Sequence, residues 1–108
     1  MSAYILAMSN ITDAKKYNNE FMPAVKKAHA AYDIKTVAVS NAPHQMLTGT
    51  PRVNHVVILQ AQDEAHARAF FNSPEMQTAL AIGESCMAEL RVGIIPAVSG
   101  LVEARAAE

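Results

Sequence analysis

Apolar and polar residues follow one another in blocks that predict four strands and two helical regions. Short apolar runs rich in β-branched residues are typical of strands, whereas apolar residues spaced three and four positions apart are typical of helices. The apolar runs predict strands at Ala3–Met8, Ile34–Ser40, Val53–Leu59 and Leu90–Val98. Gln45–Leu47 is expected to form a short returning strand after the second of these.

The first helical region is predicted to run from about Asp13 to Ala31, with Thr12 or Asp13 as its N-cap. One side of it carries apolar residues at the helical period, namely Tyr17, Phe21, Val25, Ala28 and Tyr32. Pro23 lies inside the region and lacks a backbone donor, so the helix is expected to bend or break there.

The second helical region is predicted in two pieces. Asp63-Glu64 opens the first piece, and its residues Ala67, Phe70 and Phe71 are expected to face a core. The chain restarts at Asn72-Ser73-Pro74-Glu75, because serine is a favoured N-cap and proline is favoured at the first helical position. Met76, Leu80 and Met87 form the expected inner stripe of the second piece.

The predicted order is β, α, β, β, α, β, which is the signature of an α+β, ferredoxin-like fold with an antiparallel sheet and helices on one face. The first and third strands are apolar at consecutive positions, so both of their faces favour burial. Burial of apolar area contributes roughly 25 cal/mol per Å². A second copy of the chain is the simplest cover for the face without helices, which predicts a homodimer, a dimeric α+β barrel. Residues 1–98 are expected to form this single domain, and 99–108 a C-terminal tail.

Charge and cysteine content narrow the classes of partner. The 108 residues include 9 Lys and Arg against 10 Asp and Glu, and the basic residues are scattered, so neither nucleic acid nor a membrane surface is an expected partner. Cys86 is the only cysteine, which excludes an intramolecular disulfide and fits a reducing compartment. The N-terminal residues have the pattern of neither a signal peptide nor a membrane span, so the expected location is cytoplasmic.

Four histidines, His29, His44, His55 and His66, are the first candidates for chemistry. Their spacing matches no metal-binding motif, so no metal is expected. The sequence also has no Gly-rich phosphate loop, so nucleotide binding is disfavoured, and no cofactor is expected. His55 lies in the third strand on the same side as Val57 and Leu59, where an imidazole either finds a hydrogen-bond partner or lines a pocket. His55 is therefore the candidate catalytic residue, and Tyr4 and Arg91 on neighbouring strands are candidates to bind substrate with it.

The sequence also resembles a known family. Tyr4-Ile5, Ile11-Thr12-Asp13 and above all the motif Ala67-Arg68-Ala69-Phe70-Phe71-Asn72-Ser73-Pro74-Glu75 are similar to the bacterial family called domain of unknown function 1330, in the dimeric α+β barrel superfamily. The resemblance extends over about Ala3 to Pro96 and implies the same fold and a dimer.

The chain departs from this family at several polar positions. The glycine pair expected after the first helix is replaced by Tyr32-Asp33, and the arginine usual in the last helix falls on Gly83. Relatives in the superfamily that cleave haem place a histidine where this chain has Leu80, and the tryptophan they use is also missing. The resemblance therefore implies a divergent member, and haem degradation is disfavoured.

Two functional hypotheses remain. In the first, a small apolar molecule is bound or converted in a pocket between sheet and helices, with His55 positioning or deprotonating it. In the second, the chain is a non-catalytic dimeric structural or assembly domain. Whether the protein is an enzyme is left open, because one fold serves many functions.

Overall fold

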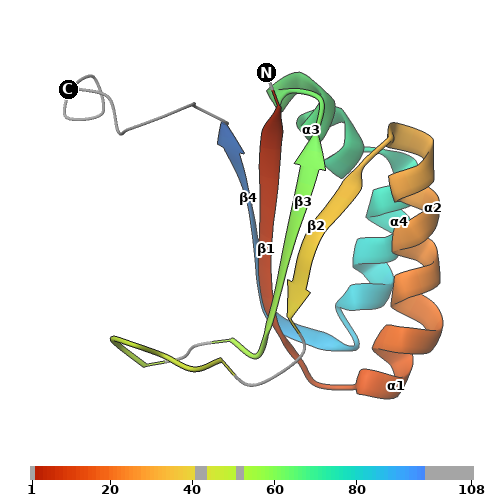
Figure 1. The fold of residues 1–108 in the computed structure, drawn as a ribbon. Coiled ribbons are helices and arrows are strands. Elements are labelled where there is room, and N and C mark those ends of the chain that lie inside the picture. The colour runs from red at the N-terminus through yellow and green to blue at the C-terminus, as the bar shows by residue number, and fades with distance from the viewer. Residues whose placement is uncertain (1, 41–43, 51–52, 97–108) are drawn as a thin grey trace, which may run out of the picture.

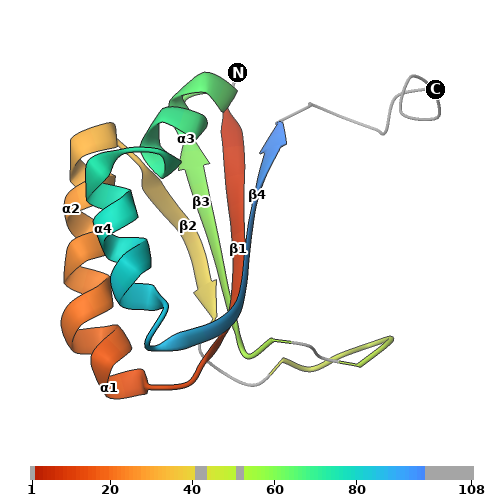
Figure 2. The ribbon, with the colours of Figure 1, turned by 180° about the vertical axis from the view of Figure 1, so that it is seen from behind.

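The computed structural model describes residues 2–40, 44–50 and 53–96, which form one antiparallel sheet with all helices on one side (Figures 1 and 2). The strands, in the order in which they lie side by side, are β2 (Lys35–Ser40), β3 (His55–Ala61), β1 (Ala3–Ile11) and β4 (Met87–Pro96). This is the predicted ferredoxin-like βαββαβ topology, with the first and third strands central. The expected tail, 99–108, lies outside the described residues.

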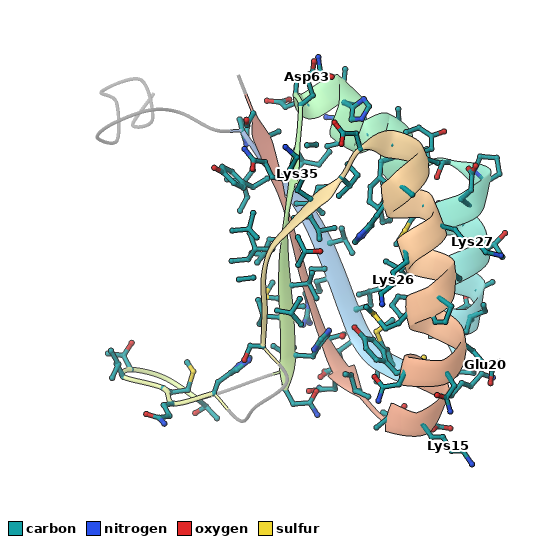
Figure 3. The ribbon with its side chains drawn as sticks, turned by 45° about the vertical axis from the view of Figure 1, so that its right-hand side comes forward. Lys15, Glu20, Lys26, Lys27, Lys35 and Asp63 are labelled. Carbon is teal, nitrogen blue, oxygen red and sulfur yellow. The ribbon has the colours of Figure 1, made fainter. Side chains whose placement is uncertain are left out.

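The helical layer contains five segments, which are α1 (Ala14–Lys16), the π-helical turn η1 (Tyr17–Phe21), α2 (Met22–Tyr32), α3 (Glu64–Phe71) and α4 (Pro74–Gly83). Lys15, Glu20 and Lys27 point outward from this layer into solvent (Figure 3). Within the described part of the chain, no helix is both long enough and apolar enough to cross a bilayer.

Side-chain caps fix where the helices begin. The Asp13 carboxylate accepts a hydrogen bond from the Lys16 N–H at 3.0 Å, and the Asp63 carboxylate accepts one from the His66 N–H at 2.7 Å. The Ser73 hydroxyl oxygen accepts a hydrogen bond from the Met76 N–H at 3.1 Å. The predicted Ser73-Pro74 start of the last helix is therefore confirmed, and each cap satisfies a backbone donor that the helix itself leaves free.

The expected disturbance of the first helix lies earlier than Pro23. Pro23 is the second residue of α2 and directly follows η1 in one continuous helical stretch, so its missing N–H leaves a carbonyl of the preceding turn without a helical donor. The irregular segment is η1, in which the Met22 N–H donates to the Tyr17 carbonyl five residues earlier. Tyr17 and Phe21, four positions apart, both face the sheet, and both are buried.

The segment after β2 also differs from the prediction. Gln45–Leu47 forms no strand, and the Leu47 side chain is 97% exposed. In the described part of this segment, no neighbouring strand supplies backbone hydrogen bonds, which a strand requires.

The two faces of the sheet have different cover. On the helix side, Ile5 of β1 and Leu59 of β3 pack with Phe21 and Phe70 in the main core. The opposite side, here called the outer face, is covered by no described helix or strand (Figures 1 and 3). Strand register places on it Tyr4, Leu6, Met8, Ala38, Val56, Ile58, Arg91 and Ile95.

Candidate functional site

His55 is the first residue of β3, and its side chain lies on the helix side of the sheet with 2% of its surface exposed. Its Nε2 is 2.6 Å from the Tyr17 hydroxyl, and its Nδ1 is 3.1 Å from the Ser40 carbonyl oxygen. The Tyr17 ring meets the imidazole edge-on, with 5.1 Å between ring centroids. The imidazole is thus held in a fixed orientation by three elements: the start of β3, η1 and the end of β2.

The hydrogen-bond partners define the protonation of this pair. A carbonyl oxygen only accepts, so Nδ1 of His55 donates to Ser40, and Nε2 of the neutral ring accepts from the Tyr17 O–H. Burial lowers the pKa of His55, an effect that the Ser40 bond opposes and nearby His44 reinforces. Burial, with a smaller contribution from Cys86, raises the pKa of Tyr17 to about 12. Near neutral pH the site therefore holds a neutral imidazole and a neutral phenol.

The lowered pKa of His55 predicts a loss of stability in acid. Because the unfolded chain takes up the proton at higher pH than the folded chain, the contribution is present above pH 6.5 and is lost as the pH falls toward the folded pKa. The slope is at most about 1.4 kcal/mol per pH unit for one histidine. Urea unfolding at pH 7, 6 and 5 is expected to show a smaller acid loss in His55→Gln than in the wild type. Equal losses of unfolding free energy in the two proteins would contradict this prediction.

An apolar cavity adjoins the pair. It has a volume of about 60 Å³ and is here called the inner cavity, and its walls include Tyr17, His55, Ala7, Phe71, Leu80 and Val92. This volume has room for only a few water molecules. Any larger ligand therefore has to extend into the space beside it.

Two open clefts, both lined by Val92 of β4, provide that space. The α3 cleft, about 390 Å³, is lined by Arg68 and Asn72 together with apolar residues of β1 and β4. The α4 cleft, about 430 Å³, is lined by Glu84 and Leu90 among others. Phe71 and Val92 line both clefts and the inner cavity, so the three spaces adjoin one another at these two side chains.

Tyr4 and Arg91 do not join His55 in one chain, which corrects the predicted grouping. His55 pairs with Ser9 of β1, and Tyr4 lies five positions from Ser9, so its side chain leaves the opposite face of the strand. Arg91 pairs with Met8, the neighbour of Ser9, and also lies on the outer face. The catalytic role of His55 and the ligand-binding roles of all three residues remain predictions.

Three residues of the site were missed from the sequence. The sequence places Tyr17 in the apolar stripe of the first helix and downstream of the Ile11-Thr12-Asp13 of the family resemblance, but not in the site, although a buried tyrosine hydroxyl usually requires a hydrogen-bond partner. Arg68 and Asn72, four positions apart at the end of α3, gave no signal beyond their place in the family motif.

Among the described residues there is no cluster of three or more metal-ligating side chains.

The family model for domain of unknown function DUF1330 matches residues 2–98. The chain belongs to this family. In this DUF1330 chain, the matched range contains His55, Tyr17 and every residue that lines the inner cavity and the two clefts. None of the curated proteins compared with it is similar in sequence.

Solved structures with the same fold have low sequence identity to the DUF1330 chain. A protein of unknown function from Rhodopseudomonas palustris has a TM-score of 0.74 and 14% identity, covering 92% of this chain and 84% of that one. A dimeric ferredoxin-like protein of unknown function from Thermobifida fusca has a TM-score of 0.63 and 19% identity, covering 90% and 92%. SnoaB, a cofactor-independent oxygenase from Streptomyces nogalater, has a TM-score of 0.56 and 13% identity, covering 94% and 98%.

Proposed function

We propose that this protein binds a small, mostly apolar molecule between β4 and the α3–α4 layer, and that His55 removes a weakly acidic proton from it. The observation that carries this proposal is a buried, neutral His55–Tyr17 pair at the wall of an apolar cavity that adjoins two open clefts. A neutral imidazole is a general base, and its action requires a free lone pair at a fixed position.

The chemistry uses residues of the chain alone. The ligand displaces the Tyr17 phenol from Nε2, and the freed imidazole lone pair then takes a proton from a carbon next to a carbonyl group of the ligand. The C–H electron pair stays on the ligand as an enolate, and the Tyr17 O–H donates to the enolate oxygen. The Ser40 carbonyl accepts from Nδ1 throughout and stabilises the imidazolium that forms. The fold likeness to SnoaB, named as a cofactor-independent oxygenase, supports chemistry without a bound cofactor.

Hydrogen exchange tests this proposal without knowledge of the natural substrate. The probe is 1-indanone, a small apolar ketone, dissolved in D₂O and followed by NMR at the carbon next to its carbonyl group. We expect the wild-type protein to accelerate exchange, and His55→Gln to lower the protein-catalysed rate by about 100-fold, the usual scale of a general base. Tyr17→Phe is expected to lower it by less.

His66→Gln is the matched control, since His66 lies on α3 against the Tyr32 carbonyl and away from the cavities. It is expected to keep the wild-type rate. Equal exchange rates in the wild type and His55→Gln would contradict the general-base role and favour a non-catalytic domain.

For the outer face, we propose that a second copy of the chain covers it. Leu6, Met8, Val56 and Ile58 of the central strands are only half-buried there, although their side chains are aliphatic. A contiguous apolar surface of this kind is typical of an interaction site. The description of the Thermobifida fusca protein as dimeric supports a copy of the same chain as the partner.

A further inference from the structure

The space along β4 has a basic end and an acidic end. Arg68 and Asn72 line the α3 cleft, whereas Glu84 lines the α4 cleft. Between them lie the apolar inner cavity and the shared side chains of Phe71 and Val92. A ligand that extends over both clefts therefore meets a positive charge at one end, apolar walls in the middle and a negative charge at the other end.

We infer that the ligand is an amphipathic anion whose acidic group binds Arg68 and Asn72 and whose apolar body extends past Phe71 toward His55. This rests on the proposed function, since it assigns the charge and orientation of the molecule bound in the same space. The acidic group belongs to the carboxylate, sulfonate or phosphate class, all of which present several acceptor oxygens.

The geometry of the end of α3 suits such a group. Arg68 and Asn72 are four positions apart, so their side chains leave the same side of the chain. A guanidinium presents a planar fork of donors to an oxyanion, and the Asn72 amide adds a further donor. The other walls of the α3 cleft are apolar and include Ile5, Ala67 and Ile94. Arg68 and Asn72 are themselves exposed, so water competes for the ion pair, and the apolar walls hold the body of the ligand beside it.

The Arg68 guanidinium is free to bind a ligand. Within residues 2–40, 44–50 and 53–96, it forms neither an ion pair nor a hydrogen bond. Glu64, four positions earlier on α3, does not line the cleft. Glu84 would repel an anion from the α4 cleft, and therefore only one orientation of an amphipathic anion is favourable.

Two dyes with one aromatic skeleton test the inference. 8-Anilinonaphthalene-1-sulfonate is anionic, and N-phenyl-1-naphthylamine is the same molecule without the sulfonate. Fluorescence titration of the wild-type protein is expected to show binding of both. Arg68→Gln is expected to raise the Kd of the anionic dye by at least 10-fold and to change that of the neutral dye by less than twofold. Asn72→Asp is expected to act in the same direction.

Lys27→Gln is the matched control, because it removes the same charge from the solvent side of α2, away from both clefts. It is expected to leave both Kd values unchanged. Displacement of the anionic dye by decanoate, decyl phosphate and decanol then distinguishes the acidic groups: a carboxylate or a phosphate ligand is expected to compete better than the alcohol. An equal effect of Arg68→Gln on both dyes, or no effect on either, would overturn the inference.

Ala7→Val separates this inference from the proposed function. Ala7 lines the inner cavity, and two added methyl groups reduce its volume without a charge change. If Ala7→Val weakens the neutral dye while Arg68→Gln leaves the anionic dye unaffected, then only the anionic ligand class is wrong. If Ala7→Val affects neither dye, binding in this space is itself contradicted. Circular dichroism of each variant checks that it is folded.

Discussion

Phe70→Ala is expected to lower the free energy of unfolding by about 3–5 kcal/mol, the usual cost of truncating a fully buried phenylalanine. Phe70 is 1% exposed on α3 and lies against two residues of α2, with ring-centroid distances of 5.5 Å to His29 and 6.2 Å to Tyr32. It therefore joins both helical regions to the sheet, and its removal leaves a cavity at their junction. Urea unfolding of the wild type and the variant measures the difference.

Phe71→Ala is the matched control, since it removes the same side chain one position later on the same helix. Phe71 is half-buried and lines the two clefts and the inner cavity, so its ring is already partly in contact with open space. Its removal is expected to cost less than half as much stability as Phe70→Ala. Equal losses from the two variants would contradict the assignment of Phe70 to the core and Phe71 to the ligand space.

The elements that could be predicted from the sequence are those with local chemical signals. Ser73 followed by Pro74 predicts a helix start, because the serine side chain caps the adjacent backbone N–H groups and the proline ring fixes the adjacent backbone in a helical conformation. The β-branched run around Val57 likewise predicts a strand from its neighbours alone. The order of elements, and with it the ferredoxin-like topology, follows from such local patterns, whereas the family was indicated by the resemblance of the motif that ends in Ser73-Pro74-Glu75.

The site depends on contacts that local patterns do not contain. Tyr17 and His55 are 38 positions apart, and their hydrogen bond exists because η1 packs over the start of β3. The faces of Tyr4 and Arg91 depend on strand register, which shifts by a bulge between Met8 and Asn10. A sequence indicates which residues of a strand point to opposite faces. The register of the neighbouring strand decides which of these residues share a face with His55.

Ile58→Glu is expected to convert a dimer into a monomer, because Ile58 lies near the centre of the outer face. It pairs with Leu6 on one side and Ala38 on the other. A carboxylate buried at that point against a second copy of an apolar face lacks a partner, and an unpaired buried charge costs several kcal/mol. Sedimentation equilibrium is expected to give the wild type about twice the chain mass of 11.6 kDa. The variant is expected to dimerise at least 100-fold more weakly.

Ala81→Glu is the matched control, since it adds the same charge at an exposed position of α4 in the helical layer. It is expected to keep the wild-type mass, because the outer face is unchanged. His55 lies on the helix side of β3, so a folded Ile58→Glu monomer is expected to retain the Tyr17–His55 pair. A wild-type protein that is monomeric at micromolar concentration, or an Ile58→Glu variant that dimerises as tightly as the wild type, would show that the outer face is not the interface.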